Sequence, residues 1–235
     1  MGKQTWKPGN MLYPVPAVMV SCADRAGRTN IITVAWAGTV CTNPPMLSIS
    51  VRPERFSYGL LRDSGEFAVN LVGRSLARAC DWCGVKSGRD VDKWAEMGLT
   101  PEPAETLEHA PVIAESPVNI ECAVRDVLEL GSHHLFLAEV RAVRVDERLI
   151  DEAGKLHLER ANLVAYSHGE YFDLGRSLGT FGYSVRKKPA VAPKRQGKGE
   201  RPGSTGHGRP ENGSKRNGTR SEKGRERGGK GRPKR

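Results

Sequence analysis

The stretch that decides the fold spans residues 30–51 and reads NIITVAWAGTVCTNPPMLSISV. Its first half, residues 30–40, is rich in β-branched and small side chains and predicts one long strand. Residues 43–45, Asn-Pro-Pro, interrupt the run because proline cannot donate a hydrogen bond to a strand ladder. Residues 46–51 then alternate apolar side chains with serines, the two-residue period of a strand with one buried face. The stretch therefore predicts two strands joined as a hairpin across residues 42–45.

The rest of the first 186 residues repeats this pattern of strands and tight turns. Gly131-Ser132 predicts a two-residue hairpin turn between two long strands. Further strands are predicted over residues 17–23, 67–71, 120–130, 135–145 and 163–167. Helices are predicted over residues 57–63, 75–83 and 90–97, the first ending near Gly65. Antiparallel strands with few helices favour a mainly β fold, a Greek-key-like antiparallel barrel with short helices. No G-x-G-x-x-G or Walker loop follows a strand in the sequence, which argues against a Rossmann or P-loop nucleotide site.

Charge divides the chain into two parts. Residues 187–235 hold 17 Lys and Arg against 4 Asp and Glu, a net charge of +13, whereas residues 1–186 hold 20 basic and 23 acidic residues, a net charge of −3. We expect residues 1–186 to form one domain and residues 187–235, rich in Gly, Lys and Arg, to be a disordered tail. The tail is interpreted either as a nonspecific contact for nucleic acid or another polyanion, or as a solvated extension without a dedicated partner.

The cysteines indicate a reducing compartment. Five is an odd number, and the N-terminus lacks the apolar segment of a secretory signal, so we expect a cytoplasmic protein. No run approaches ~18 apolar residues, so no membrane span is expected. Cys80 and Cys83 form a C-x-x-C motif, which a redox site would place at the start of a helix and a zinc site would pair with a second motif. No second pair exists, and inert thiols are the favoured interpretation.

Small and hydroxyl side chains mark a candidate ligand surface on the predicted hairpin. One parity of its strands carries Thr33, Ala35, Ala37, Thr39, Ser48 and Ser50. If these side chains share a face, they form a shallow shelf on which a flat heteroaromatic ring can reach main-chain hydrogen-bonding groups. The alternative is a sheet face covered by a helix, where small residues allow close approach.

Cationic residues follow this shelf along the chain. Arg52 and Arg55 come directly after the third predicted strand, and Lys86, Ser87, Gly88, Arg89 and Lys93 surround a loop that we expect to open a helix near Asp90. A helix N-terminus, a hydroxyl and ammonium groups together suit a phosphate, whereas the alternative is an ordinary solvated loop.

Two histidines, His133 and His134, follow the Gly131 turn. His133 is a candidate for contacting a ligand or moving a proton, although a histidine at a hairpin end is more often merely half exposed. Adjacent strand residues point to opposite faces, so no metal site is expected from this pair.

Several motifs occur here in an order that resembles a known family. They are residues 30–39, 43–51, 55–57 (RFS), 65–70 (GEFAVN), 83–93 (CGVKSGRDVDK), 131–140 (GSHHLFLAEV) and 171–185. Together they cover roughly residues 10–186 and are similar to the flavin reductase-like family, which includes flavoredoxins. Each motif alone is weak evidence, but the ordered set is specific.

The resemblance implies a split β-barrel, a homodimer and an FMN near the subunit interface. It implies an isoalloxazine ring against Trp36, Ala37, Gly38, Thr39, Ser50 and Val51. It implies a phosphate near Arg52, Arg55, Ser57, Lys86, Ser87 and Lys93, and places His133 on the flavin or nicotinamide side. Thr33 and Ser48, from the shelf, complete the expected cofactor-binding residues.

The sequence therefore predicts an oxidoreductase that passes electrons from NADH or NADPH through FMN to an acceptor. The choice of nicotinamide and the acceptor stay open. Two alternatives also stay open: an FMN electron carrier reduced by a protein partner, and a nucleic-acid-binding protein that acts through the basic tail.

Overall fold

The computed structural model describes residues 1–186 and divides the chain into two units, Met1–Thr180 and Phe181–Arg235. The strands of the first unit are β1 (Val15–Pro16), β2 (Val18–Ala23), β3 (Thr29–Val34), β4 (Ala37–Cys41), β5 (Met46–Val51), β6 (Glu66–Leu71), β7 (Pro101–Glu102), β8 (Val112–Ile113), β9 (Val118–Glu129), β10 (His134–Val145), β11 (Val164–Ser167) and β12 (Glu170–Asp173). Its α-helices are α1 (Phe56–Ser64), α2 (Ala77–Val85) and α3 (Lys93–Met97). Short 3₁₀ turns are η1 (Arg74–Leu76), η2 (Glu147–Leu149) and η3 (Leu158–Ala161), and η4 (Tyr183–Val185) lies in the second unit.

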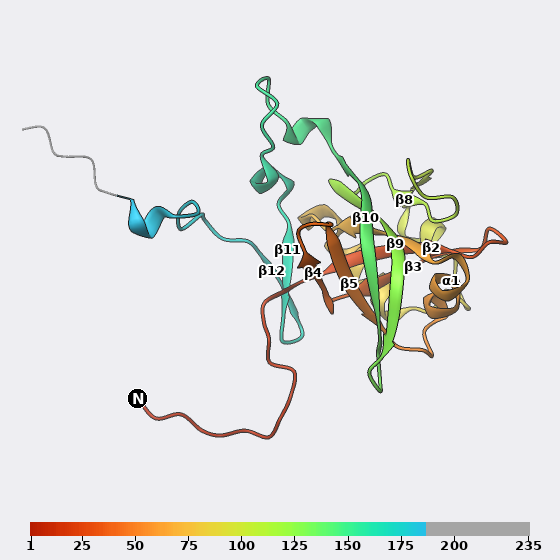
Figure 1. Cartoon of the computed structure of the whole chain (residues 1–235), viewed down its shortest axis with the longest axis horizontal. Coiled ribbons are helices and arrows are strands. Elements are labelled where there is room, and N and C mark those ends of the chain that lie inside the picture. The colour runs from red at the N-terminus through yellow and green to blue at the C-terminus, as the bar shows by residue number, and fades with distance from the viewer. Residues whose placement is uncertain (187–235) are drawn as a thin grey trace, which may run out of the picture. The chain divides into compact units, whose positions relative to one another are not determined.

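A seven-stranded antiparallel sheet forms the body of the first unit. Its strand order is β3-β2-β6-β9-β10-β5-β4, with the long hairpin β9–β10 near its middle (Figure 1). Side chains from β2, β3, β5, β6, β9 and β10 meet in one apolar cluster around Phe67 and Phe136, so the sheet curls around a common core. This confirms the predicted mainly β fold with short helices.

A second apolar cluster lies outside the barrel. It packs Cys80 and Cys83 of α2 and Trp94 of α3 against Met19 and Ile31 of β2 and β3. Strand β2 is therefore buried on both faces, which explains its largely apolar sequence VMVSCA; the hydroxyl of its one polar residue, Ser21, donates to the carbonyl of Pro111. Helices α2 and α3 are held on the barrel at the strands that precede the candidate site.

Several expected elements are confirmed at their predicted positions. The hairpin between β9 and β10 turns at Gly131-Ser132, where Gly131 has φ +88° and the amide of Leu130 donates to the carbonyl of His133 over 3.1 Å. Helix α1 ends at Gly65 in the left-handed conformation, as its sequence predicts. Hairpin β4–β5 forms across residues 42–45.

The prediction of one strand over residues 30–40 is wrong. The chain bends at Ala35 and Trp36, and the two halves become β3 and β4, which lie at opposite ends of the strand order. The bend is fixed by tertiary pairing, because the amide of Ser50 donates to the carbonyl of Trp36 over 2.8 Å. No glycine or proline marks the bend in the sequence, so local pattern alone does not reveal it.

Within residues 1–186, every helix is too short or too polar to span a membrane. The predicted tail, residues 187–235, lies outside the described residues.

Candidate functional site

Two adjoining cavities lie where the chain leaves β3 and β5. The Trp36 cavity, about 140 Å³, is lined by residues that include Thr33, Trp36, Ser50, Val51 and His133. The Lys93 cavity, about 180 Å³, is lined by residues that include Ser57, Cys83, Lys86, Ser87 and Lys93. Both share Ile32, Arg52 and Arg55 in their walls, so the cavities are neighbours. The structure thus brings most of the predicted site residues together.

The Trp36 cavity has an aromatic wall and a main-chain floor. The ring of Trp36 packs against Tyr13, with centroids 6.2 Å apart and planes tilted by 44°. Its main-chain carbonyl is held by Ser50, which fixes the position of the bend. Such a pocket, apolar at its wall and polar at its backbone, suits a flat ring with hydrogen-bonding edges.

His133 closes one side of the Trp36 cavity. Its Nδ1 lies 3.0 Å from the hydroxyl of Ser132. Burial lowers the pKa of His133 below its usual 6.5, and the positive charge of Arg52 lowers it further. The ring is therefore neutral at pH 7 and can both donate and accept a hydrogen bond.

The predicted shelf is wrong in its register. Ala37 lies opposite Ile49, and Thr39 opposite Leu47, so these side chains share the core face of β5. Gly38 lies opposite Ser48 on the other face. The lining of neither cavity includes Ala37, Gly38, Thr39 or Ser48.

Thr33 is not on an open shelf, because helix α2 packs against it. Its hydroxyl donates to the carbonyl of Cys80 in α2, and a Cβ on Gly84 would lie 3.1 Å from the Cβ of Thr33. For this residue the alternative holds: a helix covers the strand, and small residues allow the close approach. Thr33 is also one of the residues that line the Trp36 cavity.

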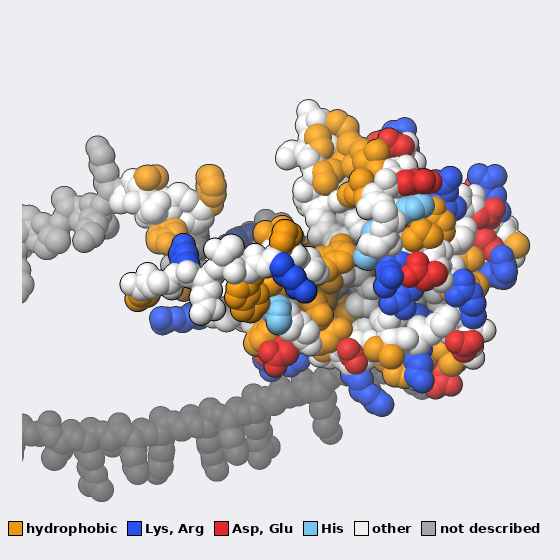
Figure 2. Space-filling model, turned by 90° about the horizontal axis from the view of Figure 1, so that it is seen from below, with side chains coloured by type: hydrophobic (Ala, Val, Ile, Leu, Met, Phe, Trp, Pro, Cys, Tyr) orange, Lys and Arg blue, Asp and Glu red, His pale blue; other side chains and the backbone are white. Residues whose placement is uncertain are grey.

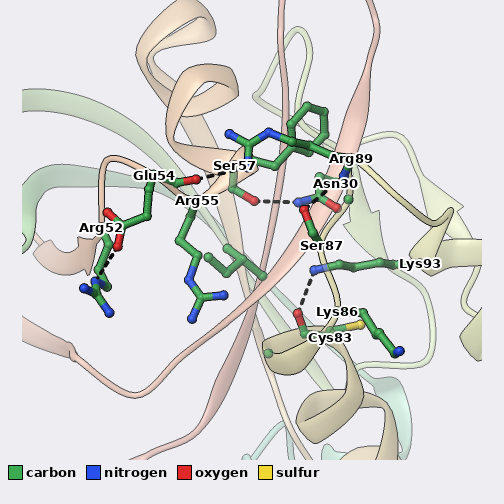
Figure 3. Close-up of a pocket in the computed structure, with 14 residues that line it drawn as sticks. Asn30, Arg52, Glu54, Arg55, Ser57, Cys83, Lys86, Ser87, Arg89 and Lys93 are labelled. Carbon is green, nitrogen blue, oxygen red and sulfur yellow. Dashed lines mark hydrogen bonds and ion pairs between the residues drawn. The ribbon is translucent and has the colours of Figure 1, made fainter.

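The Lys93 cavity gathers hydrogen-bond donors from three segments. Figure 3 shows Arg52 and Arg55 on one side and Ser87, Lys86 and Lys93 on the other. Ser57, at the start of α1, is 1% exposed, and its hydroxyl accepts a 2.7 Å hydrogen bond from Nδ2 of Asn30. This bond leaves the hydroxyl hydrogen of Ser57 free to donate.

Lys93 is the most deeply placed cation of the cavity. The residue is 3% exposed, and its Nζ donates to the carbonyls of Ile31 (2.8 Å) and Cys83 (2.6 Å). Burial lowers its pKa below 10.5; the thiol of Cys83 opposes this shift, and Arg55 adds to it. Two of its three N–H groups are used, so one remains for a ligand.

The predicted helix N-terminus near Asp90 is wrong. Helix α3 begins at Lys93, and the carboxylate of Asp92 accepts hydrogen bonds from the amides of Trp94 and Ala95. The helix start is therefore capped by the Asp92 carboxylate, which occupies the amides of Trp94 and Ala95. The anion-binding character of the cavity comes from side chains instead.

The structure adds Asn30 and Phe56, which sequence reasoning did not assign to the site, and it shows how Gly88 of the predicted loop is packed. Asn30 orients Ser57, and Phe56 lines the Lys93 cavity. Gly88 is packed so closely that a Cβ there would lie 2.6 Å from Cγ of Asn30 and 2.7 Å from Cδ1 of Phe56. Only the glycine itself carried a sequence signal, as an isolated Gly between polar residues.

The C-x-x-C cysteines are inert in this fold. Cys80 and Cys83 lie inside α2 and are buried, rather than exposed at a helix start. Burial raises the pKa of Cys80 to about 12 and that of Cys83 to about 11. Both remain thiols at neutral pH, which disfavours a redox role.

Comparison with known proteins identifies the family to which the chain belongs. Residues 11–175 match the Flavin reductase like domain. The chain belongs to the flavin reductase-like family. This confirms the resemblance carried by the ordered motifs, and the seven-stranded sheet is the split barrel of that family.

Individual members of the flavin reductase-like family support the assignment. Flavoredoxin of Desulfovibrio vulgaris (Miyazaki F) superposes with a TM-score of 0.73 at 30% identity, covering 79% of this chain and all of that one. An uncharacterized protein of Aeropyrum pernix is 39% identical over 134 residues, 57% of this chain, and the match spans only 50% of that relative. The NADH:riboflavin 5'-phosphate oxidoreductase of Streptomyces pristinaespiralis is 22% identical over 152 residues, 63% of this chain and 80% of the relative.

Proposed function

We propose that this flavin reductase-like protein is an oxidoreductase that binds FMN across the two cavities. The observation that carries the proposal is a set of cations without acidic partners. Within residues 1–186, Arg55, Lys86 and Lys93 line the Lys93 cavity, and none of them forms an ion pair with a carboxylate. Of the three, Lys93 is buried and the other two are exposed; a buried cation without a countercharge is costly, and a phosphate would offset that cost.

The donors of the Lys93 cavity fit a phosphate monoester. Arg55 and Lys86 would neutralise its charge, and the hydroxyls of Ser57 and Ser87 would donate to its oxygens. Asn30 holds the Ser57 oxygen from behind, so the hydroxyl hydrogen is directed away from Asn30. The remaining N–H of Lys93 would serve the same anion.

The Trp36 cavity would hold the isoalloxazine ring. Trp36 and Val51 would contact the ring faces or edges, and the main chain beside Ser50 would exchange hydrogen bonds with it. His133, neutral at pH 7, would orient a ligand or hold a proton at Nε2, since Nδ1 faces Ser132. Held there, FMN would supply the chemistry of hydride acceptance from NADH or NADPH and of electron transfer to an acceptor.

A nicotinamide donor is supported by a relative's name. The Streptomyces relative is an NADH:riboflavin 5'-phosphate oxidoreductase. The similarity to a flavoredoxin favours a second candidate, an FMN carrier reduced by a protein partner. Stopped-flow bleaching of the bound flavin by NADH or NADPH separates the two, because a carrier would bleach slowly or not at all.

We also propose that the protein is a homodimer. Large apolar side chains stand exposed on the segments that flank the barrel, among them Met11, Leu12, Leu174 and Leu178. Figure 2 shows hydrophobic side chains exposed between charged ones on one face of the molecule. Burying such surface is favourable at about 25 cal/mol per Å², which a second copy would provide. Light scattering across a concentration series tests this proposal, and a monomer at every concentration would refute it.

The test of FMN binding is a titration of the apoprotein with FMN and riboflavin. We expect tight binding of FMN, and weaker binding of riboflavin because it lacks the phosphate. The double variant Arg55→Ala, Lys86→Ala should weaken FMN binding by at least about tenfold and weaken riboflavin binding much less, since Arg55 also lines the Trp36 cavity but riboflavin has no phosphate to lose. A protein that binds neither flavin would overturn the proposal.

A further inference from the structure

Arg89 stands on the boundary of the Lys93 cavity. Two larger basins open beyond it, one of about 540 Å³ that includes Arg28 and Asp63 and one of about 460 Å³ that includes Arg28 and Trp94. Arg89 and Phe56 line all three spaces. The pair therefore forms the wall between the Lys93 cavity and the outer basins.

The Arg89 side chain is held across this wall at several points. Its Nη1 donates to the carbonyl of Glu54 over 3.1 Å (Figure 3), and its guanidinium carbon lies 5.8 Å from the ring centroid of Phe56. Its main-chain amide donates to the hydroxyl of Ser87 over 3.2 Å. Arg89 thus ties residues 86–90 to the turn at residues 52–55.

The two segments that Arg89 ties together differ in how they are held. Gly88 has no room for a side chain against Asn30 and Phe56, so the backbone below Arg89 is tightly seated. Glu54, whose carbonyl receives Arg89, is paired through its carboxylate with Nε of Arg52 over 2.8 Å. The contact therefore runs from a tightly seated segment, residues 86–90, to a turn that carries an exposed ion pair.

The wall formed by Arg89 and Phe56 limits how far a ligand can extend beyond its first phosphate. A terminal phosphate fits in the Lys93 cavity, whereas a flavin dinucleotide must continue from that phosphate into an outer basin. Arg89 lies across that path. We infer that Arg89 blocks this path and so makes the site select FMN over FAD, an inference that rests on the proposed function. This blocking role of Arg89 is called the latch. In this role Arg89 determines specificity and takes no part in hydride transfer.

An outer basin that binds the adenylate part of FAD would give a different experimental result. If Arg28 and Arg89 instead held the adenylate part of FAD in the outer basins, loss of either arginine would weaken FAD binding. Under the latch, loss of Arg89 strengthens FAD relative to FMN, and loss of Arg28 changes nothing, because Arg28 lines the basins but not the Lys93 cavity.

The experiment is calorimetric titration of the full-length apoprotein with riboflavin, FMN and FAD. Wild type, Arg89→Ala and the control Arg28→Ala are compared by the ratio of FAD affinity to FMN affinity. We expect Arg89→Ala to raise this ratio by about tenfold or more, and Arg28→Ala to leave it at the wild-type value. Arg89 is exposed, so the variant is expected to fold, which circular dichroism checks.

The possible results separate the latch from the proposed function. Wild-type protein that prefers FMN to riboflavin, with a ratio unchanged or lowered in Arg89→Ala, would overturn the latch alone. A lowered FAD affinity in both variants would assign the outer basins to the adenylate part of FAD. Wild-type protein that binds FMN no better than riboflavin would overturn the phosphate site and the latch with it.

Discussion

The ammonium of Lys93 donates to the carbonyl oxygen of Cys83 over a distance of 2.6 Å. Cys83 belongs to α2 and Lys93 begins α3, and the same ammonium also reaches Ile31 of β3. One charge therefore links two helices to the barrel at the floor of the Lys93 cavity. Because its partners are carbonyls and not carboxylates, its positive charge is available to an anionic ligand.

This arrangement predicts that phosphate recognition depends on pH. The folded pKa of Lys93 lies below the unfolded value of 10.5, so the ammonium loses its proton as pH rises through the lowered pKa. The ratio of FMN affinity to riboflavin affinity should fall over that interval, because only FMN carries the phosphate. Titrations of both flavins from pH 7 to the alkaline limit of stability measure it. A ratio that stays constant would contradict the role of Lys93.

The matched variant for this experiment is Lys93→Met. Methionine is one atom shorter than lysine, is also unbranched and removes the charge, so the alkaline change in the FMN to riboflavin ratio should disappear. The carbonyls of Ile31 and Cys83 lose a partner, which should cost about 1–3 kcal/mol in the free energy of unfolding. Urea denaturation at pH 7 measures that cost separately from binding.

Gly88→Ala should weaken FMN binding without unfolding the protein. The added Cβ would lie 2.6 Å from Cγ of Asn30 and 2.7 Å from Cδ1 of Phe56, so residues 86–89 must shift away from the cavity. We expect a loss of FMN affinity of about tenfold or more. Gly59→Ala is the control: it lies in α1 with no atom within 4 Å of its new Cβ, and should stabilise the helix by about 0.5–1 kcal/mol. Equal FMN affinities in both variants would contradict the role of Gly88.

Much of the fold could be predicted because its signals are local. The alternation in residues 46–51, the Gly131 turn and the Gly65 helix stop each arise from a few neighbouring residues, and each is confirmed. The bend at residues 35–36 could not be predicted in this way. It depends on pairing with Ser50 and on closure of the barrel, and these are long-range effects.

The candidate site shows the same division between local and tertiary information. Three residues predicted to bind a phosphate line one cavity: Arg55, Lys86 and Ser87. They could be predicted because cationic and hydroxyl side chains can be identified directly from the sequence. The face of Ala37 and Thr39 was mispredicted, because a bend of two residues changes which parity faces the core. The role of Asn30 as a partner of Ser57 needs a contact across 27 residues and has no sequence signal.

The buried thiols should resist alkylation in the native protein. Burial raises the pKa of Cys80 to about 12 and that of Cys83 to about 11, so the reactive thiolate is scarce at pH 8. Iodoacetamide treatment followed by mass spectrometry should modify Cys41, which is partly exposed, well before either of them. The same reagent in urea provides the control in which all five react. Rapid native modification of Cys83 would reopen a redox role for the motif.

His157 should give the segment around η2 and η3 a pH-dependent local stability. Its Nε2 lies 2.8 Å from Asp151 and its Nδ1 2.8 Å from Glu159. The hydrogen bond to Asp151 raises the pKa of His157 above 6.5, and the same contact lowers that of Asp151 to about 2. The stabilisation is therefore complete between pH 3.8 and 6.5, is lost as pH rises through the raised pKa of His157, and is lost in acid as Asp151 protonates. Hydrogen exchange of the His157 amide, which donates to Leu149 over 2.7 Å, should show greater protection at pH 5 than at pH 8.5 after correction for intrinsic rates. In His157→Gln this difference should vanish, and equal protection in the wild type would show that the ionic contacts do not hold the segment.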